Sequence, residues 1–208
     1  LEGLTYGEDP SGGVVRDRQF IHPRFDFAFT APPLLKLENT TEALLGLDMN
    51  GTTAMRFDVI QSDQSPMASL EKGWIESVKI EQIEETLING LSSATGLGTN
   101  SEWSFRFAAI RKGSDLYRFI FATKTLTPEL DRQFLESIKS FRSLRAEERE
   151  ALRPLRLTMA LASESDTIEK LIAQMRGVDR PLDRFLIVNG LDRPKIKSGM
   201  NYKLITAD

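Results

Sequence analysis

The chain has 208 residues, of which 40% are hydrophobic and 27% charged, with a net charge of −3 and no cysteine. This composition is typical of globular proteins and leaves room for one large domain or two small ones. It excludes disulfides and thiolate metal sites, offers no basic field for nucleic acid, and contains no uncharged run of the roughly 18 residues needed to span a membrane.

Residues 1–24 contain glycine, proline and charged residues without a sustained period, so we interpret them as a linker or N-terminal extension. Val14-Val15 and Phe20-Ile21 are expected to pack on a neighbouring element. Because the chain starts at Leu1 without a signal peptide, we expect it to be part of a longer protein or a mature form.

Residues 25–145 alternate between apolar and polar positions, which predicts an antiparallel sheet with short connections. Strands are expected over 25–30, 34–37, 44–49, 53–60, 83–88, 92–97, 103–109 and 116–122. Asn89-Gly90 predicts a tight hairpin because both positions tolerate a positive φ. Gly96-Leu97-Gly98 lacks the third glycine of a nucleotide-binding loop and is interpreted as a hairpin end.

Two helices are expected to cover this sheet, starting at Ser65-Pro66 and Thr127-Pro128, where a capping side chain precedes a first-turn proline. Their apolar faces are expected to consist of Met67, Leu70, Trp74 and Val78 in the first, and Leu130, Phe134, Ile138 and Phe141 in the second. Trp74 is therefore assigned to the core. The sequence predicts an α+β module over 25–145, followed by a charged linker over 146–154 that separates two packed units.

Residues 155–208 show the order strand, helix, helix, strand. The strands are expected over 155–161 and 202–205. The first helix opens at Ser165-Asp166-Thr167-Ile168, and the second begins after Arg180-Pro181 and ends at Gly190. This part is predicted to be a small βααβ domain.

The ionisable residues do not form a catalytic set. His22 is the one histidine, which excludes an H-E-x-x-H zinc site and also a Ser–His–Asp triad unless His22 serves in it, so we interpret it as a turn or packing residue. The pairs Glu84-Glu85 and Glu147-Glu148 are expected at the surface. Arg106 and Arg118 lie on neighbouring predicted strands, and we expect them to share a face with Glu102 or Asp115 in an ion-pair ladder. No catalytic residue, metal ligand or cofactor is expected in this segment.

The first module contains Phe27-Ala28-Phe29-Thr30-Ala31-Pro32, Ile88-Asn89-Gly90-Leu91 and Ser137-Ile138-Lys139-Ser140-Phe141-Arg142. With its order of strands and helices, it resembles the Mog/PsbP-type α/β module. A longer succession includes Tyr6-Gly7-Glu8-Asp9-Pro10, His22-Pro23, Glu102-Trp103 and Tyr117-Arg118-Phe119-Ile120-Phe121. Together with the tail, this succession resembles the region after the protease domain in bacterial secreted zinc metalloproteases of the HtpX/BepA-like class, peptidase family forty-eight.

The four elements of residues 155–208 resemble a LysM domain. This chain has Ser165-Asp166-Thr167-Ile168 where LysM sequences usually have Gly-Asp-Thr-Leu, and Ser198-Gly199 where Pro-Gly is usual. The resemblance implies a shallow groove for chains that contain N-acetylglucosamine. Its candidate glycan-binding residues are Ser165, Asp166, Thr167 and Ile168 on one side and Asn189, Gly190 and Leu191 on the other. In the alternative interpretation, these residues only cap and end helices.

The resemblances imply a non-catalytic accessory region of a periplasmic or secreted zinc metalloprotease. Zinc would then belong to a catalytic domain upstream of Leu1, and the partners would be that protease domain, protein substrates or partner proteins, and peptidoglycan. The alternatives are a free-standing ligand- or protein-binding module with a decorative tail, or an enzyme in its own right.

Overall fold

The structure is a computed structural model that describes residues 3–7, 10–175 and 178–207. Residues 1–2, which belong to the expected linker, Glu8 and Asp9 of the quoted motif, and residues 176–177 and 208 of the last part lie outside the described residues. The chain forms two compact units: one is residues 13–144, and the other combines residues 1–12 with residues 145–208. None of the helices in the described part of the chain has both the length and the hydrophobicity of a membrane span.

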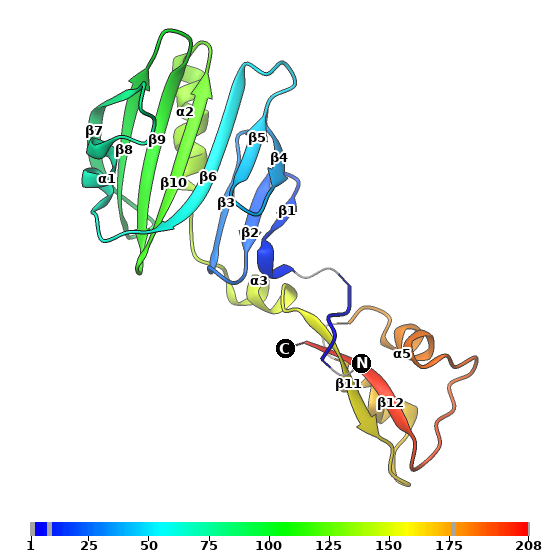
Figure 1. The fold of residues 1–208 in the computed structure, drawn as a ribbon. Coiled ribbons are helices and arrows are strands. Elements are labelled where there is room, and N and C mark those ends of the chain that lie inside the picture. Colours follow the sequence, from blue (N-terminus) through cyan, green and yellow to red (C-terminus); the bar gives the residue numbers. More distant parts are fainter. Residues whose placement is uncertain (1–2, 8–9, 176–177, 208) are drawn as a thin grey trace. The chain divides into compact units, whose positions relative to one another are not determined.

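The larger unit contains two antiparallel sheets (Figure 1). The seven-stranded sheet has the order β4 (Lys36–Asn39), β5 (Leu44–Leu47), β6 (Thr53–Gln61), β10 (Asp115–Thr123), β9 (Ser104–Lys112), β8 (Leu91–Thr99) and β7 (Lys79–Ile88). The three-stranded sheet has the order β1 (Val14–Arg16), β2 (Gln19–His22) and β3 (Phe27–Thr30). The expected α+β class with an antiparallel sheet and packing helices is confirmed.

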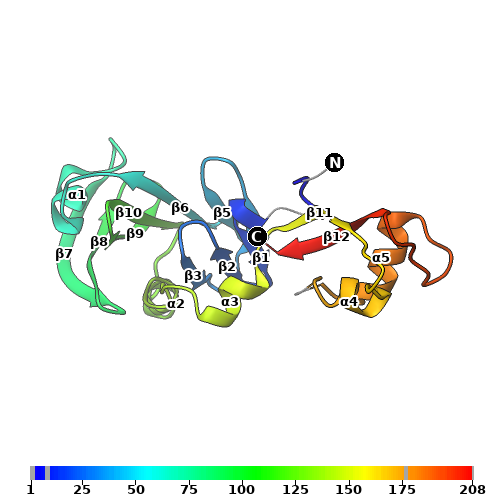
Figure 2. The same ribbon diagram turned by 90° about the horizontal axis from the view of Figure 1, so that it is seen from below.

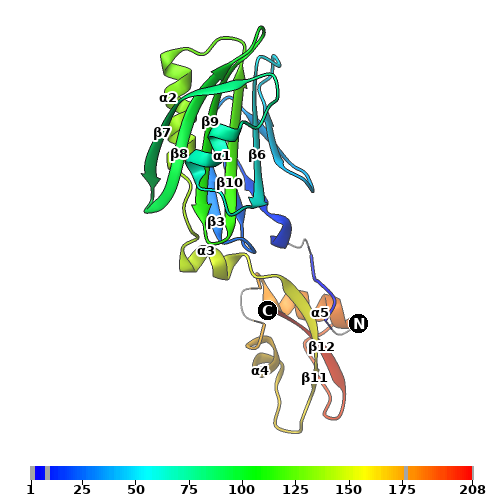
Figure 3. The same cartoon turned by 60° about the vertical axis from the view of Figure 1, so that its left-hand side comes forward.

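The seven-stranded sheet is covered on both faces. The three-stranded sheet and helix α2 (Pro128–Lys139) pack on one face, the inner face (Figure 2). Helix α1 (Pro66–Lys72) packs on the opposite, outer face over β7, β8 and β9 (Figure 3). The inner core is mostly aromatic, and Phe134 of α2 stacks on Phe121 with 4.6 Å between ring centroids. Each buried ring removes a large apolar area from water, and together the rings stabilise the unit.

The hairpin predicted at Asn89-Gly90 is confirmed, with φ values of 49° and 82° and Ile88 paired with Leu91. Asn89 has a second role that sequence patterns did not show. Its side-chain amide donates hydrogen bonds to the carbonyl oxygens of Lys139 at 3.1 Å and Phe141 at 2.7 Å, just past the end of α2. One residue therefore sets a turn and satisfies the open carbonyl groups at a helix end.

Residues 13–24 are not the linker that the sequence suggested, because Val14–Arg16 and Gln19–His22 are strands β1 and β2. Phe20 and Ile21 are buried, and the turn between the strands places Asp17 at φ 53°. Strands of three and four residues are too short to show a hydrophobic period. The glycines and charged residues around them therefore led to the linker interpretation.

Glycines account for two further corrections. Helix α1 ends at Lys72 because Gly73 adopts φ 80°, so Trp74 and Val78 lie beyond the helix on which they were placed. Trp74 is only partly buried and donates from its indole nitrogen to Ser69 Oγ at 3.0 Å. Gly96 and Gly98 are not a hairpin end but lie inside β8, where an added Cβ would meet Ile80 or Val78 at 2.6 Å. Glycine at these two positions lets the side chains of Ile80 and Val78 lie close to the backbone of β8, which the sequence pattern does not show.

The smaller unit has the expected βααβ order. Its elements are the 3-10 helix η1 (Pro10–Gly12), α3 (Ala146–Ala151), β11 (Leu155–Leu161), α4 (Ile168–Ile172), α5 (Pro181–Asn189) and β12 (Asn201–Ala207). Strand β11 pairs antiparallel with β12, and both helices pack on a core around Phe185. Helix α3 occupies part of the stretch 146–154 that was interpreted as a linker, since its charged sequence supports a helix with i,i+3 ion pairs such as Arg145–Glu148.

The N-terminal segment completes this unit. Gly3 N donates to Leu157 O at 2.8 Å, Leu157 N to Leu4 O at 2.9 Å, and Tyr6 N to Leu155 O at 2.6 Å. Residues 3–6 thus lie along β11 as a further antiparallel strand segment, with a bridge between Thr5 and Arg156. The interpretation of residues 1–24 as a linker is therefore also wrong for residues 3–6.

Candidate functional site

The first candidate loop of the predicted glycan groove is held by local hydrogen bonds. Asp166 Oδ2 accepts from Ser163 N at 2.7 Å and from Ser163 Oγ at 2.8 Å, and these bonds lower the pKa of the Asp166 carboxyl. Thr167 caps helix α4 by accepting from Lys170 N, Ser165 Oγ lies 3.2 Å from Ser163 Oγ, and Ile168 is buried in the core. Backbone groups of this loop are engaged as well, because Asp166 N donates to Ser163 O and Thr167 O accepts from Leu171 N.

The second candidate loop is used even more completely by the fold. The Asn189 amide donates to Phe185 O at 2.9 Å and to Lys203 O at 2.8 Å, and its oxygen accepts from Lys203 N at 2.7 Å. Gly190 ends α5 with φ 61°, and Leu191 N donates to Leu186 O. Asn189 therefore ties α5 to β12, and among the described residues no hydrogen bond joins this loop to residues 165–168.

The expected ion-pair ladder of Arg106 and Arg118 is wrong. Register places Arg118 beside Ala109 and Arg106 beside Phe121, so the two guanidinium groups lie on opposite faces of the sheet. Side chains alternate between faces along a strand, and three residues separate Arg118 from Phe121. Arg106 on the inner face binds Asp131 of α2, whereas Arg118 on the outer face binds Asp58.

The ionisable groups form no recognisable catalytic centre in the described part of the chain, where no group of three His, Asp or Glu side chains is placed to hold a metal ion. His22 packs beside Phe27, with their ring centroids 5.5 Å apart, and burial lowers its pKa. A half-buried imidazole beside phenylalanine rings has a packing environment.

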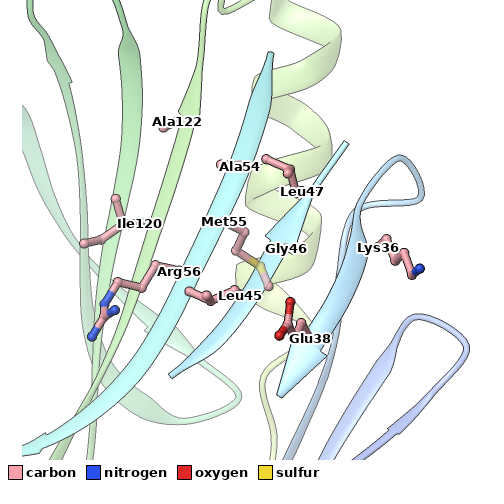
Figure 4. Close-up of a pocket in the computed structure, with 10 residues that line it drawn as sticks. All are labelled: Lys36, Glu38, Leu45, Gly46, Leu47, Ala54, Met55, Arg56, Ile120 and Ala122. Atoms are coloured by element: carbon pink, nitrogen blue, oxygen red, sulfur yellow. The ribbon is translucent and has the colours of Figure 1, made fainter. Parts of the chain in front are cut away.

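The hollow with the clearest apolar lining lies on the outer face of the seven-stranded sheet, beyond α1, and has a volume of about 350 Å³ (Figure 4). Strand pairing builds it in two rows. The first row is Lys36, Leu47, Ala54 and Ala122, and the second is Glu38, Leu45, Arg56 and Ile120. The two short alanine side chains leave the depression, and the leucines and Ile120 border it. Leu45 and Leu47 remain 38% and 54% exposed, although both sit on a regular strand.

The charged residues that line this hollow, Lys36, Glu38 and Arg56, carry a net positive charge, and Arg56 also belongs to an ion-pair group beside it. Asp58 is buried and accepts from Arg56 Nε at 2.9 Å and from Arg118 Nε at 2.7 Å. Arg118 also lies 5.3 Å from the centre of the Trp74 ring, which fixes its guanidinium. Two cations share one carboxylate, so the exposed Arg56 has unused donors at the edge of an apolar surface.

No family model matches the chain, and no curated protein matches it. Several solved structures are similar to it. The solution structure of cyanobacterial PsbP (CyanoP) from Synechocystis sp. PCC 6803 has 12% identity and a TM-score of 0.46, and covers 63% of this chain and 95% of that one. A point mutant of the protein Mog1 has 12% identity and a TM-score of 0.44, and covers 60% and 94%. A crystal structure from Bacteroides thetaiotaomicron VPI-5482 has 12% identity and a TM-score of 0.46, and covers 87% and 73%.

Sequence reasoning missed the outer hollow. The signal that it left unused is Leu44-Leu45-Gly46-Leu47, which places leucine on both faces of one strand. A strand with one face in water normally has polar residues at every second position. Leu45 and Leu47 therefore form an exposed apolar surface that does not pack in the core of this unit.

Proposed function

We propose that this chain is a non-catalytic protein-binding region and that the outer hollow is its docking face. The observation that carries the proposal is the exposure of Leu45 and Leu47 around the depression left by Ala54 and Ala122. The occupant is an apolar segment of another protein that carries an acidic residue opposite Arg56, because the Arg56–Asp58–Arg118 group has one more cation than anion.

Recognition at this face would combine two physical terms. Covering each leucine contributes about 1–2 kcal/mol of hydrophobic free energy, and the alanine floor lets a partner side chain insert between them. The arginine supplies orientation, because an acidic group placed elsewhere on the partner would remain unpaired. The alanines and leucines thus give affinity, and the cationic border gives register.

An amphipathic helical peptide with leucine on one face and a flanking glutamate is the probe for this surface. The methyl signals of Leu45, Leu47, Ala54, Ile120 and Ala122 are expected to shift in an NMR titration, and Leu47→Asp should weaken binding about tenfold or more. Met49→Asp is the matched control, because Met49 is 101% exposed and does not line the hollow. Equal binding by both variants, or no methyl shifts, would remove the proposal.

We further propose that this region accompanies the catalytic domain of a zinc metalloprotease in a periplasmic or secreted protein. The support is the motif succession and the small βααβ unit. The partners are then that protease domain and protein substrates, and zinc belongs to the catalytic domain. The coding sequence upstream of Leu1 tests this: a signal peptide followed by H-E-x-x-H supports it, and an upstream reading frame without that motif removes it.

The LysM-like tail gives a second candidate function, which is weak binding of N-acetylated glycans of peptidoglycan. Its support is the βααβ order, whereas the Asn189 side chain serves the fold. A shallow site without an aromatic platform is expected to bind with a Kd of about 10⁻⁴–10⁻³ M. Titration of the full chain with chitin oligomers should shift the amide signals of Thr167 and Gly190 at millimolar sugar, and their constancy would leave the tail a structural or protein-docking unit.

A further inference from the structure

Strand β7 forms a free edge of the seven-stranded sheet (Figure 1). It pairs with β8 on one side, and within the described residues no backbone group of Lys79–Ile88 bonds to any other segment. An edge strand presents a row of donors and acceptors that another strand can use. The opposite edge differs, because β1 lies against β4 and Asn39 donates to Gly13 O there.

Only the first half of the β7 edge is protected against pairing with another strand. A bulge between Glu81 and Glu84, with Gln82 at φ 51°, interrupts the register of the first half. From Glu84 to Ile88 the pairing is regular, and Leu87 is 72% exposed. Bulges are a common protection against unwanted strand addition. The second half of this strand lacks that protection and is the part that can pair.

A groove runs beside this second half. It has a volume of about 400 Å³ and lies between the inner face of β7 and helix α2. Its lining includes Glu84, Thr86, Ile88, Leu135, Ile138 and Lys139. A strand added to β7 would place every second side chain into this groove against Leu135 and Ile138, and the others on the outer side beside Glu85 and Leu87.

The negative charge along the β7 edge determines which kind of strand can pair with it. Glu84 and Glu85 are exposed, and neither carboxylate has an ion pair or hydrogen bond among the described residues. Pairing of β7 with a second copy of itself would bring these carboxylates together, which is unfavourable. We propose that the Glu84–Ile88 edge accepts an extended, lysine- or arginine-containing peptide segment as an additional strand, with apolar side chains in the groove beside α2. This site is independent of the outer hollow.

The probe is a blocked six-residue peptide of alternating valine and lysine, titrated into the full chain at low salt. Amide signals of residues 84–88 and 135–139 are expected to shift, hydrogen exchange along 84–88 should slow, and affinity should fall as salt rises. The variant Glu85→Lys should weaken binding about fivefold, because it replaces an attractive contact with the outward-facing lysines by a repulsive one.

The matched control is Glu42→Lys, which makes the same charge change at an exposed position away from the groove and should alter affinity less than about twofold. A second control peptide has glutamate in place of lysine and should not bind. The proposal is overturned by absent shifts, by shifts at the outer hollow instead, by equal binding of the two peptides, or by concentration-dependent dimers that protect 84–88 without peptide.

Discussion

Replacing Asp131 by alanine should lower the free energy of unfolding of residues 13–144 by about 3 kcal/mol. Asp131 accepts from Arg106 Nε at 2.7 Å and from Nη2 at 2.6 Å, and the Arg106 side chain is 10% exposed. Without the carboxylate, a guanidinium remains buried under α2 without its partner, and the cost of desolvating it is no longer offset. Urea unfolding followed by tryptophan fluorescence measures the change.

Two companion variants separate this buried pair from ordinary helix electrostatics. Glu129→Gln removes a carboxylate from the same first turn of α2, but Glu129 pairs with Arg132 in water and its loss should leave the urea midpoint nearly unchanged. Arg106→Met combined with Asp131→Leu should recover most of the lost stability, because no charge is then stranded. If Asp131→Ala proves as mild as Glu129→Gln, the pair does not anchor the helix.

Removing residues 1–7 should unfold the smaller unit while the larger unit keeps its own unfolding midpoint. The deletion removes three backbone hydrogen bonds with β11, which are worth about 3 kcal/mol in total. It also removes Tyr6, which packs on the core and accepts from Arg184 Nη1 at 3.2 Å. A single core of this size supplies about 3–5 kcal/mol, so the remaining two-stranded sheet should not hold the fold.

Amide spectra report this outcome directly, because signals of residues 155–207 should collapse to the random-coil range while those of residues 14–144 stay dispersed. Tyr6→Ala should produce a partial loss, whereas Leu4→Ser should have little effect because the Leu4 side chain is 51% exposed. Retention of dispersed signals for β11 and β12 after the deletion would show that residues 3–6 are dispensable.

Much of the larger unit could be predicted from its sequence because several of its long strands alternate between apolar and polar residues. Thr53 to Ile60 and Trp103 to Ala109 show the period of two, and Asn89-Gly90 fixes a register. The βααβ order of the tail followed from helix caps and breakers such as Thr167 and Gly190. These signals are local, and each acts within a few residues.

The features that sequence reasoning missed depend on distant partners. The strand character of residues 3–6 exists only because β11 offers its edge, and the close packing at Gly96 exists only because Ile80 lies across from it. The partner of Arg106 came from a helix 25 residues away, whereas the pattern offered Glu102 and Asp115 nearby. The loop predicted to bind glycans shows the same limit, because the Asn189 side chain already hydrogen-bonds the backbone of Lys203.

The pairing of residues 3–6 with β11 also affects the order of events during synthesis. Arg156 Nη1 donates to Gly3 O across 153 positions of the chain. A ribosome that adds about 5–20 residues per second needs about 8–30 seconds to deliver the partner strand after the first segment has emerged. During that interval, residues 3–6 expose an unpaired edge and Tyr6 has no core to enter. Variants that slow translation before residue 155 should therefore increase the fraction of nascent chains captured by chaperones.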